Sequence, residues 1–299
     1  MAPLSGGQHI TQEMIRVVLL NNRNFSYAYG LEIVLEHNNE TTMIPSKRTA
    51  TFMVISVAIV NQIIIYYWSD IVPRLRPYLD NSMISLCFSI VTFIPVAIAM
   101  KFLFSWNKWA PALGLKNDFK IVFVIAVVSA TPMFIGNSLL SPNLDLRFTT
   151  FFDQALRPGF CEELVYRGFL FGLLYRFCGW GFIPASLVGS ILFGLGHAYQ
   201  GDDLASSMAA VGFTSIGALW FSWLYAESKY NLWLPVCLHV LMNWSVDVFA
   251  IGGGVLLDPK SNLFRLATMA LGVAFTLYLR IKRREKIVTF RSLLVNRRT

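Results

Sequence analysis

The chain has 299 residues, of which 55% are apolar and only 14% are charged, and its formal net charge is +8. Soluble domains carry about 25% charged residues, so this composition, with a mean hydropathy of +0.54, excludes an ordinary soluble globule. The densest basic cluster, residues 280–286, directly follows the last apolar segment. Basic residues in that position are typical of a topology signal and of contact with anionic lipid, and they argue against a nucleic-acid partner.

Five stretches of the chain contain no Asp, Glu, Lys or Arg, and each is long enough for a membrane-spanning helix of about 18–20 residues. They are residues 49–69, 81–100, 121–144, 177–201 and 204–226. Lipid offers no partner to unpaired backbone groups, so the spans are expected to be helices. The pattern predicts an all-α, polytopic membrane helix bundle of about eight transmembrane helices, at residues 49–69, 82–103, 120–141, 151–175, 181–199, 204–226, 231–251 and 263–280.

Three regions follow from these spans. Residues 1–48 are expected to form a polar amino-terminal arm or small cytoplasmic region, residues 49–281 the transmembrane domain, and residues 282–299 a basic cytoplasmic tail. An even number of spans places both flanking regions on one side of the membrane. Lys and Arg are concentrated in the segments of that side, and this bias predicts that both termini are cytoplasmic. The opposite side holds only Arg74, Arg76, Arg147 and Lys260.

Two adjacent carboxylates, Glu162 and Glu163, interrupt the fourth predicted span. Carboxylates at membrane depth are costly, and this predicts a functional role for them. Positions four apart share one face of a helix, so Glu163 is expected to pair with Arg167. Glu162 projects about 100° away from Glu163 and is expected to stay free to act on water. The alternative is a structural ion-pair network, which accounts for Glu163 with Arg167 but not for Glu162.

Two of the four histidines fall in later apolar segments, each within a polar motif. His197 follows Phe193 by four residues, and His239 precedes Asn243 by four, which places an imidazole and an amide on one helical face. The alternative for both motifs is hydrogen bonding between helices.

Together these groups are the ingredients of water activation with oxyanion stabilisation. Glu162, His197 and His239 are also plausible zinc ligands, so a metal-dependent and a metal-free mechanism both remain open. Cys161 adjoins Glu162, but a small apolar side chain that packs between helices is expected there rather than a nucleophile. The four cysteines show no CxxC spacing, and no disulfide framework is predicted.

The ordered set Glu-Glu-x-x-x-Arg, Phe-x-x-x-His and His-x-x-x-Asn resembles the CPBP family of intramembrane proteases. This family is also called the CAAX-protease or bacteriocin-processing family, and it includes the eukaryotic Ras-converting endopeptidase. The resemblance covers about residues 151–244, with Gly168 after the arginine and the run Leu232–Pro235 before the second histidine. It implies a bundle of eight spans and an intramembrane endopeptidase.

Residue by residue, the resemblance implies that Glu162 and His197 activate the attacking water and that Glu163 and Arg167 hold the site together. His239 and Asn243 would stabilise the tetrahedral oxyanion. The family has been described both as metalloproteases, with zinc as cofactor, and as metal-free glutamate proteases, and the sequence does not decide between them.

The expected partners are the lipid bilayer and a peptide or membrane-protein substrate. The short loops resemble bacterial members, so a bacterial inner membrane is the expected location and a prenylated substrate ranks second. Two other functions stay open: a non-catalytic scaffold or bacteriocin-immunity protein that uses the same polar cavity, and a small-solute transporter with the carboxylates as a proton relay.

Overall fold

A computed structural model describes residues 46–251, 258–287 and 289–296, all of which belong to one unit of the chain, Met43–Thr299. The expectation for residues 1–48 therefore falls almost entirely outside the described residues. The described part is helical and contains no strand, apart from one isolated bridge between Trp180 and Val295. The prediction of an all-α membrane bundle is confirmed.

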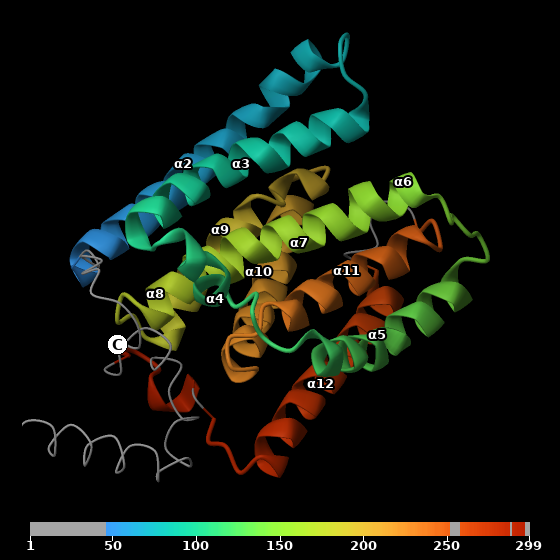
Figure 1. Cartoon of the computed structure of the whole chain (residues 1–299). Coiled ribbons are helices and arrows are strands. Elements are labelled where there is room, and N and C mark those ends of the chain that lie inside the picture. Colours follow the sequence, from blue (N-terminus) through green and yellow to red (C-terminus); the bar gives the residue numbers. More distant parts are fainter. Residues whose placement is uncertain (1–45, 252–257, 288, 297–299) are drawn as a thin grey trace, which may run out of the picture. The chain divides into compact units, whose positions relative to one another are not determined.

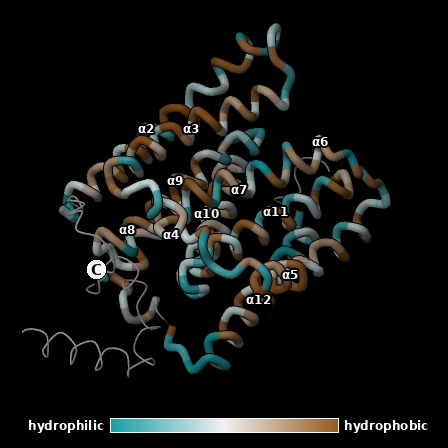
Figure 2. Tube along the Cα trace, viewed as in Figure 1, coloured by the Kyte–Doolittle hydropathy of each residue, from teal (hydrophilic) through white to brown (hydrophobic). Residues whose placement is uncertain are grey.

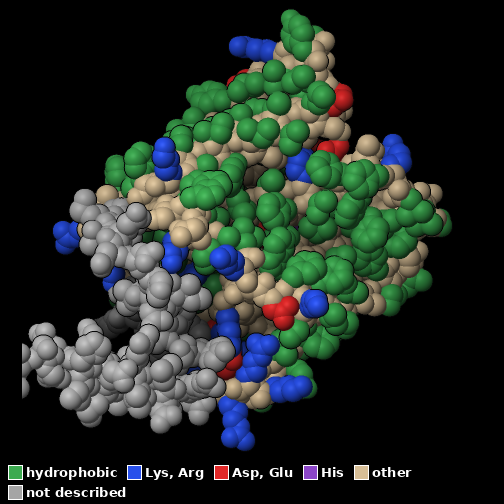
Figure 3. Space-filling view, in the orientation of Figure 1, with side chains coloured by type: hydrophobic (Ala, Val, Ile, Leu, Met, Phe, Trp, Pro, Cys, Tyr) green, Lys and Arg blue, Asp and Glu red, His purple; other side chains and the backbone are tan. Residues whose placement is uncertain are grey.

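Five helices in the described part are long and apolar enough to cross a membrane. They are α2 (Lys47–Leu75), α3 (Asn81–Leu103), α5 (Phe119–Leu140), α10 (Leu204–Glu227) and α12 (Pro259–Lys282). Figure 2 shows hydrophobic residues along α2, α3 and α5, and hydrophilic residues at the end of α12. On the face in Figure 3, hydrophobic side chains cover the α2–α3 hairpin, and Lys and Arg gather near the end of α12.

The other three predicted spans also overlap helices. Residues 148–176 form one continuous helical run, in which α6 (Phe148–Thr150), α7 (Arg157–Glu163) and α8 (Gly172–Arg176) alternate with two π-helical stretches, Phe151–Leu156 and Leu164–Phe171. The remaining two are α9 (Phe182–Leu195) and α11 (Trp233–Asp247), and the short α4 (Trp109–Leu113) connects α3 to α5.

Each of the five long helices begins at a polar residue whose side chain accepts a backbone N–H of the first turn. The first four N–H groups of a helix lack partners within it, and a capping oxygen satisfies one of them. The capping residues are Ser46, Asp80, Asp118, Asp203 and Asp258. These caps explain why α2, α3, α5 and α10 start within two residues of the start of a charge-free stretch.

Contacts between connections show that successive helices run in alternating directions (Figure 1). At one end of the bundle, Asn117 donates to the Lys229 carbonyl at 3.3 Å and the Lys229 ammonium pairs with Glu285 at 2.6 Å. At another, the Asp145 N–H donates to the Val248 carbonyl at 2.8 Å. The α3–α5 connection, the α10–α11 connection and the segment after α12 therefore meet together, as antiparallel neighbours require.

The helical run 148–176 lies at the centre of the packing. Residues 169–171 on this run are buried, and α7 and its π-helical neighbours contact α3, α9, α10 and α11. The segment 289–296 packs against the start of α9, where carbonyls of Ser292, Leu293 and Leu294 accept three N–H groups of residues 181–183. Part of the predicted basic tail is thus fixed against the bundle.

The predicted span 181–199 is longer than the helix found there, because α9 ends at Leu195. Gly194 in its last turn and Gly196 directly after it are poor helix formers. His197 lies beyond the helix, and its Nδ1 donates to the Phe193 carbonyl at 2.8 Å, which supplies a partner for one of the last helical carbonyls. A 14-residue helix is about 21 Å long, against about 30 Å for the hydrocarbon layer, so this turn lies at membrane depth if α9 starts at the interface.

We predict that Gly194→Ala lowers the unfolding temperature of the purified protein. A Cβ at Gly194 would lie 2.1 Å from Ser215 Oγ and 2.6 Å from the Val211 carbonyl oxygen, so α9 and α10 would have to move apart, at a cost of about 1–3 kcal/mol. Gly212→Ala on α10 is the matched control, because nothing lies within 4 Å of its Cβ. Thermal unfolding in detergent checks both variants, and equal midpoints would contradict the prediction.

Candidate active site

Glu163 and Arg167 form a buried ion pair on the central helical run. Arg167 Nη1 lies 2.9 Å from Glu163 Oε1, and the two side chains are 1% and 0% exposed. The predicted i,i+4 pair is therefore present, and it spans the junction between α7 and the π-helical stretch that begins at Leu164. Short π-helical segments within α-helices are frequent at functional sites.

His239 on α11 connects the two glutamates. Its Nδ1 lies 2.7 Å from Glu163 Oε1, and its Nε2 lies 3.8 Å from Glu162 Oε2. An ionised carboxylate can only accept a hydrogen bond, so Nδ1 is protonated and donates a hydrogen bond to Glu163. The distance from Nε2 to Glu162 is too long for a hydrogen bond, and Nε2 is left to face Glu162.

Two phenylalanine rings enclose the buried cation. The guanidinium carbon of Arg167 lies 4.6 Å from the centre of the Phe193 ring and 5.3 Å from that of Phe221. The Phe221 ring also stacks on the His239 imidazole, with centres 5.3 Å apart and an angle of 17° between the planes. These contacts offset part of the cost of burying the arginine and fix the plane of His239.

His197 joins the cluster through Phe193. The centres of the two rings are 4.5 Å apart, and the Phe193 ring is 6.3 Å from that of His239. The Phe193 carbonyl can only accept, so Nδ1 of His197 carries the proton in that hydrogen bond and Nε2 of a neutral ring is a free acceptor. No direct contact between His197 and Glu162 is found among the described residues.

Glu162 is the accessible carboxylate of the pair. Its side chain is 31% exposed, against 0% for Glu163, and its Oε2 is buried without a hydrogen-bond partner among the described residues. A buried polar atom without a partner is uncommon in folded proteins and requires an explanation. Oε2 of Glu163 also lacks a hydrogen-bond partner in the described part of the chain, so the two carboxylates differ in their exposure and in the ion pair that Glu163 alone makes with Arg167.

Asn243 lies one turn after His239 on α11 but is directed elsewhere. Its Nδ2 donates to the Gln154 carbonyl at 3.4 Å, and no contact among the described residues joins it to Glu162 or His239. Glu162, Glu163, Arg167 and His239 are thus brought together, His197 adjoins them, and Asn243 remains at the edge.

The structure adds residues that the sequence motifs do not contain. Gln62 of α2 donates to the Tyr166 hydroxyl at 3.2 Å and to the Leu192 carbonyl at 3.1 Å, which ties α2 to the central run and to α9. Tyr166 follows Glu162 by one helical turn. The amide at position 62 inside an apolar span is a signal that sequence reasoning could have used. Phe221 gives no such signal, since one more aromatic residue in an apolar helix is unremarkable.

The described residues contain no group of three or more His, Cys, Asp or Glu side chains arranged to hold a metal ion. Nδ1 of His239 is engaged by Glu163 and Nδ1 of His197 by a backbone carbonyl, and Glu162 contacts only the first of these rings. Glu162, His197 and His239 are not gathered into such a group, but each histidine keeps Nε2 without a hydrogen bond to the described residues, as histidines that bind a metal do. All four cysteines are free, and Cys161 is half-buried.

Residues 145–245 match a protein-family model described as type II CAAX prenyl endopeptidase Rce1-like. The matched region starts just before α6 and ends within α11, and so it contains every residue of the cluster except Gln62. A comparison of the sequence with curated proteins gives no match.

We predict that Arg167→Met destabilises the protein strongly. Removing one partner of a buried ion pair leaves the other charge uncompensated, at a cost of about 3–5 kcal/mol. Arg147→Met is the matched control, because it breaks the exposed pair with Asp145 and is expected to change little. Adding Glu163→Gln to Arg167→Met should restore part of the loss. An unchanged unfolding midpoint for Arg167→Met would show that the pair does not stabilise the fold.

Proposed function

We propose that this protein is an intramembrane endopeptidase whose attacking water is activated by Glu162, and the match of residues 145–245 to a family model described as type II CAAX prenyl endopeptidase Rce1-like supports this proposal. The observation that carries the proposal is the contact of one imidazole, His239, with both glutamates of the pair. A site built for stability alone has no use for Glu162, a second carboxylate that is 31% exposed and lies outside the Glu163–Arg167 pair.

In the proposed reaction, Glu162 takes a proton from water and the resulting hydroxide attacks the carbonyl carbon of the scissile peptide bond. His197 supports this step, since its free Nε2 can accept a hydrogen bond from the water. The carbonyl oxygen becomes an oxyanion in the tetrahedral intermediate. When the carbon–nitrogen bond breaks, the proton on Glu162 passes to the leaving amine, so atoms and charge balance over the cycle.

His239 is proposed to stabilise the oxyanion as an imidazolium. Nδ1 donates to Glu163, and a proton on Nε2 would point toward Glu162, where the reacting carbonyl must lie. A protonated His239 also makes the cluster of Glu162, Glu163, Arg167 and His239 electrically neutral. Asn243 would reach the oxyanion only if its amide left the Gln154 carbonyl, a bond that is long at 3.4 Å.

The proposed substrate is a peptide or a membrane-protein segment, with a prenylated CAAX protein as the second choice. No step above passes through a metal, and we propose that activity needs no metal ion. The concentration of Lys and Arg at the end formed by the α3–α5 and α10–α11 connections supports an orientation with that end in the cytoplasm. A bacterial inner membrane remains our proposal for location.

We predict that Glu162→Gln abolishes cleavage while the protein still inserts and folds. The substitution keeps the shape of the side chain and removes the base, and loss of a general base lowers rates by about 10²–10⁴-fold. The assay uses purified protein with a library of membrane-embedded peptides and a farnesylated CAAX peptide. Cys161→Ser, at the residue next to Glu162, is the matched control and should keep full activity. Wild-type activity should persist in a strong chelator.

Other outcomes of this assay would point elsewhere. Cleavage by Glu162→Gln at the wild-type rate would remove the glutamate from the mechanism. Loss of wild-type activity in chelator, with recovery on adding zinc, would make the protein a metalloenzyme. Peptide binding without cleavage by the wild type would favour the scaffold or immunity function.

We predict that a cysteine at Lys116 is shielded from a membrane-impermeant maleimide in intact cells, whereas a cysteine at Asn143 is labelled. The test starts from a variant without the four native cysteines, all of which lie in or beside helices of the bundle. Lys116 lies in the α3–α5 connection and Asn143 in the α5–α6 connection, so the two report opposite ends of α5. The reverse labelling pattern would invert the proposed orientation.

A further inference from the structure

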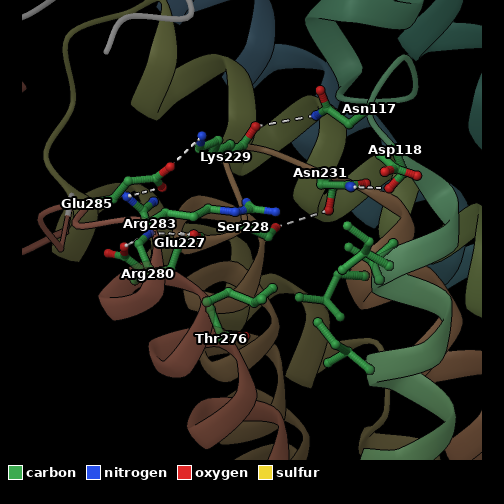
Figure 4. A pocket seen from close by; sticks show the side chains of 15 residues that line it. Asn117, Asp118, Glu227, Ser228, Lys229, Asn231, Thr276, Arg280, Arg283 and Glu285 are labelled. Carbon is green, nitrogen blue, oxygen red and sulfur yellow. Dashed lines mark hydrogen bonds and ion pairs between the residues drawn. The ribbon is translucent and has the colours of Figure 1, made fainter. Parts of the chain in front are cut away.

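A second polar site lies away from the proposed active site, between the start of α5, the α10–α11 connection and the end of α12 (Figure 4). It is a cavity of about 150 Å³ and contains none of the proposed catalytic residues. The polar residues that line it are Asn117, Asp118, Glu227, Ser228, Lys229, Asn231, Thr276, Arg280, Arg283 and Glu285. Three carboxylates and three cations are therefore gathered where helices of the bundle end.

The floor of the cavity is a buried ion pair. Arg280 Nε lies 3.2 Å from Glu227 Oε2, and the two side chains are 7% and 0% exposed. Arg280 also donates to the Glu227 carbonyl at 2.7 Å and to the Lys286 carbonyl at 3.0 Å. Glu227 Oε1 accepts from the N–H and the hydroxyl of Thr289, both at 2.8 Å. The charged groups of the floor thus have hydrogen-bond and ion-pair partners before any ligand binds.

At the mouth, the other charged side chains have partners, and the side chain of one cation is left without one among the described residues. Lys229 pairs with Glu285 at 2.6 Å, and the Asp118 carboxylate accepts the Lys120 N–H at the start of α5. Arg283 is exposed, and its side chain has no hydrogen bond or ion pair with the described residues. Figure 4 shows its side chain extending from the end of α12 across the cavity toward Ser228 and Asn231.

One wall of the cavity is apolar. Ile121, Val122 and Ile125 of α5 line it together with Leu234 and Leu279. Ile121 is 44% exposed and Val122 is buried, so this wall runs from the surface of a membrane-spanning helix into the cavity. A ligand that fits must carry an anionic group for Arg283 and a hydrocarbon part for α5.

We propose that this cavity binds a phospholipid, with the phosphate on Arg283 and an acyl chain along Ile121 and Val122. The arginine guanidinium matches the oxygens of a phosphate with two parallel hydrogen bonds. The other charged side chains of the lining pair with one another or accept a backbone N–H, so Arg283 is the cation that the cavity offers to a lipid headgroup. Inorganic phosphate offers the same anion, but it has no part that would cover the apolar wall. This proposal does not depend on the proposed protease activity.

Binding of phosphatidylglycerol to the purified full-length protein, measured by native mass spectrometry from detergent, tests the proposal. Arg283→Gln should weaken binding about tenfold, as expected for one lost charge-assisted contact. Arg284→Gln is the matched control, because it removes the same charge from the adjacent exposed position outside the cavity lining, and it should bind like the wild type. Equal affinities of the two variants would overturn the proposal.

Two further arms distinguish the source of the anion and test the apolar wall. Diacylglycerol, which has the chains without the phosphate, should bind much more weakly than phosphatidylglycerol, and inorganic phosphate should not displace the lipid. Ile121→Trp should fill the cavity and weaken binding, whereas Val124→Trp, on an exposed position of α5 outside the lining, should not. Displacement by inorganic phosphate, or equal binding of diacylglycerol, would overturn the assignment to a phospholipid.

Discussion

The burial of Glu163 with Arg167 inside a membrane bundle is the constraint on which the rest of the site depends. Neither charge is tolerable alone at low dielectric, and each acquires partners from other helices. His239 of α11 donates to the glutamate, while Phe193 of α9 and Phe221 of α10 enclose the arginine. Four helical segments are therefore held in one arrangement by the need to satisfy two charges.

The same constraint leaves Glu162 different from its neighbour. Adjacent residues on a helix point in directions about 100° apart, so only one of the two carboxylates can face Arg167. Glu162 instead faces Nε2 of His239 and keeps an oxygen without a hydrogen-bond partner among the described residues. Catalytic bonds in a site without substrate are often long, and the 3.8 Å separation is compatible with tightening on binding.

The two charged clusters, the proposed active site and the cavity beside α12, differ in how their polar groups are satisfied. In the proposed active site, unsatisfied oxygens remain on Glu162 and Glu163. In the cavity beside α12, Arg280 and Glu227 are saturated by backbone and side-chain partners, and the uncommitted group is the exposed Arg283. The first arrangement suits a reaction at membrane depth, and the second suits binding at a membrane surface.

The sequence by itself determined the helical class, the approximate positions of the helices and the pairing of Glu163 with Arg167, because charge-free length and i,i+4 spacing are local properties. It also indicated a domain later matched over residues 145–245. Only the tertiary structure decided that α9 stops at Leu195, that His239 rather than His197 contacts both glutamates, and that Asn243 turns to Gln154. It also brought in Gln62 and Phe221, from helices distant in sequence. These contacts depend on which helices pack together, and spacing along one helix carries no information about its neighbours.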